Sequence, residues 1–359
     1  MTELSAAAAP GPASWSLTVA CYGGLSNRLR VLLSGVALAE ATGRRFVMHW
    51  PVRAKSGAPY EALFENDWGA VTLDPPPPEA EWLPDLGGVL GRDWFDLATS
   101  PRPALALSSA TWLVDPQFCP GHAPLLARAA ALFSELRPVP QVRERVAAFR
   151  ATRFRPRMLG VHLRRGEFVR LHPYIVHNTG PALAALRRLL ARWPDAGLFL
   201  STDDGGPDPV TGAVRHEGVR EKLRAEFGER VVWTEPRTLD NGAVAGVQDA
   251  LVDLLLLRAT DAVVGTWWSS FSELAAFGRG VPLVYCRSGG AWAVVDWALR
   301  ASGAVAWLRR QSQQRYQGRV HPFVLALHYL NTPRRVAARQ LQRLAPGLFA
   351  RLRPHFRRR

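Results

Sequence analysis

The chain has 359 residues, of which 48 % are hydrophobic, so it can bury the cores of two ordinary globular domains. Its net charge of +15 is concentrated at the carboxyl end, where residues 301–359 contain 13 arginines and no acidic residue, which leaves only +2 for the first 300 residues. Charge alone therefore does not indicate nucleic-acid binding, and the lack of any apolar run near ~20 residues argues against a membrane span.

The amino end and the cysteines favour a cytoplasmic protein. No basic flank precedes the alanine run at residues 6–9, so we expect no signal peptide. Cys21, Cys119 and Cys286 are odd in number, far apart and without a Cys-x-x-Cys pair. They predict neither a disulfide framework nor a zinc site.

The first part of the chain begins with a strand, a glycine-rich turn, a helix and a second strand. Residues 15–22 and 45–50 have strand patterns, and apolar residues recur at helical spacing from Leu25 to Gly43. The turn between them, Gly23-Gly-Leu-Ser-Asn-Arg28, would let backbone amides approach a ligand closely. A plain tight turn is the alternative.

A less regular stretch then leads to the second part of the chain. Residues 67–111 are rich in Pro and Gly, which predicts irregular structure with short strands. A helix is expected over 123–135, and residues 137–140 are the best linker candidate. We therefore divide the chain into domains at 1–137 and 138–300, with a separate tail at 301–359.

Strands and helices alternate regularly in the second part. After a helix at 141–149, strands are predicted at 158–163, 197–202, 230–234, 262–265 and 282–286. Helices are predicted between them, at 180–193, 217–227, 247–255 and from Ser270, where Ser270-Phe-Ser-Glu273 fits a capping box. This alternation predicts an α/β fold with a parallel, doubly wound sheet.

Polar residues follow three of these strands. They are Arg164 and Arg165, then Asp203 and Asp204, and then Thr266, Ser269, Ser270 and Phe271. Since ligands of open α/β sheets bind beyond the carboxyl ends of the strands, we expect one crevice. Guanidinium groups and a helix start suit a pyrophosphate, and a carboxylate there could accept from guanine. The alternatives are solvated arginines and an aspartate that caps the next segment.

Several nucleotide-binding and metal-binding patterns are missing. The sequence contains neither a Gly-x-x-x-x-Gly-Lys-Ser/Thr loop nor a dinucleotide fingerprint after its strands. It also has no clustered Asp-x-Asp or histidine set for a divalent metal. We therefore expect Arg164, rather than a metal ion, to neutralise a departing diphosphate.

Four motifs in sequence order resemble the fucosyltransferase group, which includes α1,6-fucosyltransferases, the bacterial nodulation fucosyltransferase and protein O-fucosyltransferases. The motifs are Gly23-Gly-Leu-Ser-Asn-Arg-Leu-Arg30, Gly160-Val-His-Leu-Arg-Arg165, Phe199-Leu-Ser-Thr-Asp-Asp204 and Val264-Gly-Thr-Trp-Trp-Ser-Ser-Phe-Ser-Glu-Leu274. The resemblance extends from residue 15 to about residue 287. It implies a GT-B architecture of two Rossmann-like domains facing across a cleft, GDP-fucose as donor, inversion at the anomeric carbon and no metal or other cofactor.

The resemblance also implies roles for single residues. Arg164 would contact the β-phosphate and the breaking glycosidic oxygen with Arg165 beside it, and His162 would support the nucleotide. The resemblance places Asp203 and Asp204 near guanine. It places Thr266, Ser269, Ser270 and Phe271 in the loop that binds the phosphates. Gly23, Gly24 and Asn27 would reach the donor across the cleft from the first domain.

The sequence departs from the group after the two arginines. Gly166-Glu167 stands where a Thr-Asp is usual, and no residue matches the catalytic glutamate of the α1,6-type enzymes. Glu167 is our candidate general base and His172 the alternative. Trp267-Trp268 is bulkier than the usual phosphate loop.

The sequence therefore predicts an inverting, metal-independent glycosyltransferase. It would move a sugar, of which fucose is the favoured candidate, from a GDP-sugar to a glycan acceptor that could be lipid-linked. The tail could form a basic amphipathic helix, with Ala337, Leu341, Leu344, Leu348 and Leu352 along one side. Such a helix could lie on an anionic membrane or pack back on the first domain. The alternative functions are nucleic-acid binding through the tail, which we do not expect, and sugar-nucleotide binding without catalysis.

Overall fold

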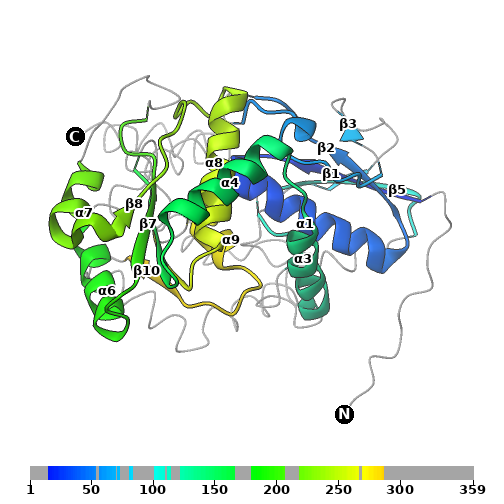
Figure 1. Cartoon of the computed structure of the whole chain (residues 1–359). Helices are drawn as coiled ribbons and strands as arrows, with labels where there is room; N and C mark the ends of the chain where they lie inside the picture. Colours follow the sequence, from blue (N-terminus) through cyan, green and yellow to red (C-terminus); the bar gives the residue numbers. More distant parts are fainter. Residues whose placement is uncertain are drawn as a thin grey trace, which may run out of the picture.

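A computed structural model describes residues 15–53, 56–69, 71–72, 81–83, 101–109, 111–114, 122–165, 179–206, 218–266 and 269–286. These residues form two five-stranded sheets in which every recorded pairing of strands is parallel, with helices packed against them (Figure 1). The predicted α/β class with parallel sheets is confirmed. Within the described ranges, no helix combines the length and hydropathy that a bilayer crossing requires.

The first sheet has the order β3-β2-β1-β5-β4. Its strands are β1 (Ser16–Cys21), β2 (Arg45–His49), β3 (Val71–Thr72), β4 (Glu81–Leu83) and β5 (Ala104–Ser109). The helical segments of this half are α1 (Leu25–Thr42), the 3-10 turn η1 (Tyr60–Ala62) and α3 (Ala123–Glu135). The strand-turn-helix-strand unit is confirmed, and β5 is a full neighbour of β1 inside the stretch that we expected to be irregular.

The second sheet has the order β10-β9-β6-β7-β8. Its strands are β6 (Met158–Leu163), β7 (Gly197–Thr202), β8 (Val231–Val232), β9 (Ala262–Thr266) and β10 (Leu283–Cys286). The helical segments of this half are α4 (Pro140–Arg153), α6 (Thr179–Arg192), α7 (Val219–Phe227), η3 (Gly228–Arg230), α8 (Val244–Arg258) and α9 (Ser270–Ala276). Every residue of β6 is buried, as expected for a central parallel strand, and β7 and β9 flank it.

The two halves share a continuous hydrophobic core. It includes Leu17 and Leu29 of the first half as well as Phe199 and Leu251 of the second. Figure 1 shows α1, α4, α8 and α9 between the two sheets. The halves are therefore packed tightly against each other.

Polar contacts also join the halves. Arg30 of α1 forms an ion pair with Glu273 of α9. The backbone amide of Gly57 donates to the carbonyl of Asn241 over 2.8 Å. A Cβ atom on Gly57 would lie 1.7 Å from the carbonyl oxygen of Gly242, so this close approach requires glycine.

The predicted capping box at Ser270 is wrong. The N-cap of α9 is Ser269, and no side chain caps the helix. The carboxylate of Glu273 cannot reach back to the N-cap because it bonds Arg30 and accepts from the hydroxyl of Tyr285. The tail at 301–359 lies outside the described residues.

Candidate functional site

A cavity of about 290 Å³ lies where residues of both halves meet. From the first half it is lined by the turn 23–27 and by Ser56. Its second-half lining includes His162, Arg164, residues 200–203, Arg220, Thr234, Asn241, Asp249, Asp253, Ser270 and Phe271. Eight of the residues selected from the sequence therefore border one cavity: Gly23, Gly24, Asn27, His162, Arg164, Asp203, Ser270 and Phe271.

The end of β6 presents Arg164 to this cavity. The backbone amide of Arg164 donates to the hydroxyl of Thr266 over 2.9 Å, and that hydroxyl donates to the carbonyl of His162 over 3.2 Å. Thr266 is buried and does not line the cavity. It therefore fixes the backbone at the end of β6 instead of offering its hydroxyl to a ligand.

His162 is a buried, neutral histidine beside Arg164. A hydrogen bond of 2.7 Å joins its Nδ1 to the Ser272 hydroxyl, and its ring packs on Phe271 with 4.8 Å between centroids. Burial lowers the pKa of His162 to about 3, and the charges of Arg164 and Arg165 contribute. The imidazole therefore carries no charge near neutral pH and can orient a ligand or Phe271 without adding a cation.

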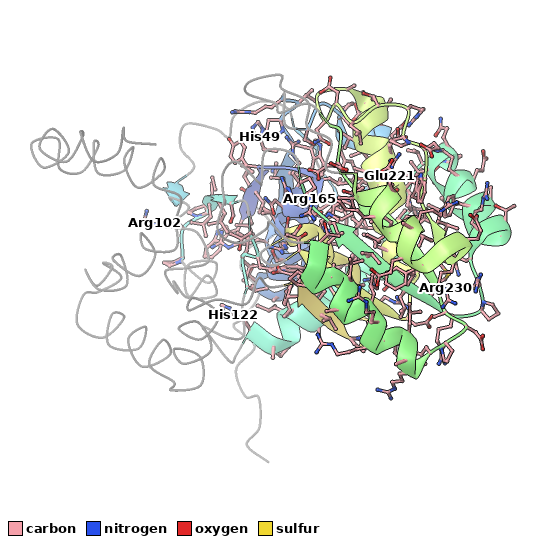
Figure 2. The ribbon with its side chains drawn as sticks, turned by 90° about the vertical axis from the view of Figure 1, so that its left-hand side faces the viewer. His49, Arg102, His122, Arg165, Glu221 and Arg230 are labelled. Atoms are coloured by element: carbon pink, nitrogen blue, oxygen red, sulfur yellow. The ribbon has the colours of Figure 1, made fainter. Side chains whose placement is uncertain are left out.

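Arg165 is buried and does not line the cavity. Its side chain is only 3 % exposed, its Nη2 donates to the hydroxyl of Thr179 over 3.1 Å, and its amide donates to Asp203. In Figure 2, Arg165 lies near the centre of the view, whereas Glu221 and Arg230 lie over the helices of the second half. Of the two adjacent arginines, only Arg164 lines the cavity.

The two aspartates after β7 have different surroundings. Asp203 is half-buried and lines the cavity, and burial raises its pKa although Arg164 and the Arg165 amide favour the charged form. Asp204 is buried and accepts from the backbone amide of Val219, the first residue of α7, over 3.0 Å. Asp204 thus has the capping role that the sequence left open, and it does not line the cavity.

The glycine-rich turn brings backbone groups to the first-half wall. Gly23 has a φ of +86°, and a Cβ atom added to it would lie 2.9 Å from the side-chain Nδ2 of Asn27. This position therefore favours glycine over any residue with a side chain. Gly24 is the N-cap of α1 and has open space where a Cβ would lie. Ser269, by contrast, is fully buried and does not border the cavity.

Sequence reasoning missed Asp253 on α8. It lines the cavity, accepts from the hydroxyl of Thr234 over 2.6 Å, and is also hydrogen-bonded by Ser201. Burial raises its pKa to about 6. The signal was present: α8 is apolar on nearly all sides, so an acid within it needs a buried partner or a ligand.

Asp249, one turn earlier on α8, holds the loop that follows β8. Its carboxylate accepts from the Arg237 amide over 2.6 Å and from Arg237 Nε over 3.0 Å. Arg145 of α4 pairs with the same carboxylate. This loop supplies Thr238, Leu239 and Asn241 to the cavity wall, so Asp249 fixes the shape of that wall.

The predicted general base is not described. Glu167 and the alternative, His172, lie outside the described residues, as do Trp267 and Trp268. Among the residues that the structure does describe, no group of three or more His, Cys, Asp or Glu side chains could hold a metal ion. Cys21 and Cys286 are both free and buried.

No protein-family model and no curated protein matches this chain by sequence. Among solved structures, it is similar to NodZ α-1,6-fucosyltransferase soaked with GDP-fucose, at 18 % identity and a TM-score of 0.52, over 76 % of this chain and 94 % of that one. A selenomethionine NodZ from Bradyrhizobium matches over the same shares of the two chains at 16 % identity and a TM-score of 0.52. POFUT1 in complex with GDP is 16 % identical over 77 % of this chain and 99 % of that one, with a TM-score of 0.49.

The structural similarity shows that this chain has the same fold as the NodZ structures. The described α/β sheets have the arrangement of a fucosyltransferase fold, in agreement with the group that the four motifs resemble. Identities of 16–18 % do not by themselves assign an activity.

Proposed function

We propose that this protein is a glycosyltransferase that uses a GDP-sugar, with fucose as the transferred sugar and a glycan as acceptor. The observation that carries the proposal is the single cavity in which Arg164, Asp203 and Asp253 meet the glycine turn of the other half. The fold adds support, because the similar NodZ structures were solved with GDP-fucose and with GDP. In this proposal residues 1–137 and 138–300 are two Rossmann-like domains of a GT-B enzyme, and the donor lies in the cleft between them.

We assign the guanine base to Asp253 in place of Asp203 and Asp204, which the resemblance implied there, because Asp204 accepts from the amide of Val219 and Asp203 from the amide of Arg165. A carboxylate fixed by Thr234 and Ser201 can accept hydrogen bonds from the N1–H and N2–H groups that distinguish guanine from adenine. Ala250 and Val247, about one and two turns before it on α8, provide apolar contact for the ring. The base and its carboxylate would thus lie together on α8.

Arg164 is the group that we assign to the diphosphate. A guanidinium group can bond two phosphate oxygens at once through its planar array of N–H donors. The Thr266 hydroxyl holds the backbone of Arg164, so the side chain starts from a fixed point. Backbone amides of the turn at Gly23 and Gly24 approach the donor from the first half.

The proposed reaction inverts the configuration at the anomeric carbon. An acceptor hydroxyl oxygen forms the new bond to that carbon while the bond to the β-phosphate oxygen breaks, and GDP leaves with the electron pair. Arg164 stabilises the negative charge of the leaving GDP. The acceptor proton goes to a general base, for which Glu167 is the proposal and His172 the alternative.

Metal independence and a cytoplasmic location, with the basic tail at an anionic membrane, are further parts of the proposal. Arg164 can take over the neutralisation of charge that a divalent ion supplies in other transferases. Turnover should therefore persist in excess EDTA. Binding to anionic vesicles should weaken when residues 337–359 are removed.

Release of GDP from a panel of nucleotide sugars tests the function directly. We expect GDP release from GDP-fucose, and an Arg164→Ala variant that is about 10²–10³ times slower because it lacks one charge at the leaving group. The matched control is Arg188→Ala, which replaces an exposed arginine on α6 whose Nε donates to the carbonyl of Ala184 in the same helix. Unchanged turnover in Arg164→Ala would refute the mechanism, and GDP binding without turnover would favour the non-catalytic alternative.

A further inference from the structure

Two arginines lie together at the carboxyl edge of the first sheet, beside the donor cavity. Arg53, four residues beyond the end of β2, is exposed, and its guanidinium carbon lies 5.2 Å from the centre of the Tyr22 ring. Arg28, on the first turn of α1, is 1 % exposed and lies 5.1 Å from the centre of the Trp50 ring. Tyr22 and Trp50 are the residues that directly follow β1 and β2.

Neither arginine has an acidic partner in the described part of the chain. The Nε of Arg28 donates to the carbonyl of Gly23 over 2.9 Å, but its Nη1 is buried with no hydrogen-bond partner. Arg30, two residues further on, is paired with Glu273, and Arg143 is paired with Glu65. Within the described residues, the edge therefore holds positive charge without a matching carboxylate.

The charges of the two arginines act on each other. The pKa of Arg28 is lowered to about 10, mainly by burial; Cys21 acts in the opposite direction, and the nearby charge of Arg53 contributes to the lowering. Like charges held close together, one of them buried, cost free energy that a bound anion would offset. This cost accounts for a binding site better than for a purely structural role.

Backbone hydrogen bonds fix Arg53 next to the cavity. Its amide donates to the carbonyl of Ser56 over 3.2 Å, and the Ser56 amide donates back to the carbonyl of Arg53 over 2.8 Å. Ser56 itself lines the cavity, as do Gly23 and Gly24, which directly follow Tyr22. Arg53 therefore lies outside the donor cavity but borders its first-half wall.

We propose that this edge, made by Arg28 and Arg53 with the ring of Tyr22, binds an anionic substituent of the acceptor, a carboxylate or a phosphate carried by the sugar next to the reacting hydroxyl. The proposal rests on the function proposed above, and it assigns the acceptor to the class of acidic glycans. Arg53 forms the ion pair, because it is exposed. The buried charge of Arg28 raises the positive potential beneath it.

Three probes that differ only at carbon 6 of one sugar test this assignment. They are p-nitrophenyl β-D-glucoside, p-nitrophenyl β-D-glucuronide and the 6-phosphate of the glucoside. Their binding to the full chain is measured by calorimetry with and without GDP, for the wild type, Arg53→Gln, Arg53→Lys and the control Arg188→Gln. Comparison of the glucuronide with the 6-phosphate shows which anion the site prefers.

We expect an anionic probe to bind about fivefold to tenfold more tightly than the neutral glucoside. Arg53→Gln should remove that preference, Arg53→Lys should keep part of it, and Arg188→Gln should keep all of it. Equal affinities for the three probes, no binding of any probe, or a preference that survives Arg53→Gln would each overturn the inference. Failure of the proposed function would look different, since the wild type would then not bind GDP at all.

Discussion

Asp249 and Asp253 lie one turn apart on the same face of α8, and their pKa values move in opposite directions. Burial would raise the pKa of Asp249, but hydrogen bonds from Arg237 and Arg145 outweigh it and lower the pKa. The described hydrogen-bond donors to Asp253 are the hydroxyls of Thr234 and Ser201, so burial dominates and raises its pKa to about 6. One carboxylate is therefore committed to the fold, and the other is available to a ligand.

Replacement of Asp253 by Asn should weaken GDP binding and stabilise the free protein. The amide cannot accept from both N–H groups of guanine as a carboxylate can, so we expect a loss of about 10-fold to 100-fold in GDP affinity, measured by calorimetry. The folded pKa of Asp253 lies above its ordinary value of 3.8, so ionisation destabilises the fold as the pH rises through about 6. Asp253→Asn removes this cost and should raise the melting temperature at pH 7.5.

Asp249→Asn is the matched control for that experiment. It leaves Arg237 and Arg145 without their carboxylate, so it should lower the melting temperature at the same pH. Lower melting temperatures in both variants would contradict the distinction between the two aspartates.

The affinity for GDP should fall as the pH is lowered. Protonation of Asp253 below about pH 6 removes the acceptor for guanine, so affinity should drop roughly tenfold for each further pH unit. GDP itself takes up a proton in this range, and the Asp253→Asn variant reports that part alone. The difference between the two titrations, measured from pH 7.5 to 5, isolates the carboxylate; parallel curves would argue against its role.

Much of the fold could be predicted because its strands are read from local patterns. The buried run ending at Leu163 and the alternation after it lead directly to β6, β7 and β9, and a parallel sheet then brings their carboxyl ends together. The position of β5 beside β1 could not be predicted in the same way. That pairing joins residues almost 90 positions apart, and the proline-rich chain between them carries no periodic signal.

The candidate site was predicted in its location more reliably than in its details. Arg164 and Asp203 follow strands, where a sheet places ligands, and both line the cavity. Thr266 and Asp204 also follow strands, but their side chains bond the backbone, which sequence cannot distinguish from ligand binding. Asp253 was not predicted as a site residue because it lies inside a helix and belongs to no recognisable sequence motif.

Removal of the Thr266 hydroxyl should slow catalysis more than it weakens donor binding. In Thr266→Val the Arg164 amide loses its acceptor, so the guanidinium is held less firmly at the leaving group. We expect kcat for GDP-fucose to fall about tenfold, with a change in GDP affinity of less than about threefold. Thr266→Ser keeps the hydroxyl and should restore kcat. Equal losses in kcat and GDP affinity would indicate a general distortion of the sheet edge instead.

Loss of the Glu273 carboxylate should destabilise both halves together. Arg30 is buried, and burial lowers its pKa, so without Glu273 its charge has no counter-charge between α1 and α9. We expect Glu273→Ala to lower the free energy of unfolding by roughly 2–4 kcal/mol, measured in urea by tryptophan fluorescence. A second change, Arg30→Met, should recover part of that loss, because it removes the unpaired charge and keeps a similar side-chain volume.

Because the hydrophobic core is continuous across the two sheets, each variant should still unfold in one transition. Two separate transitions, or no recovery in the double variant, would show that the ion pair does not couple the halves.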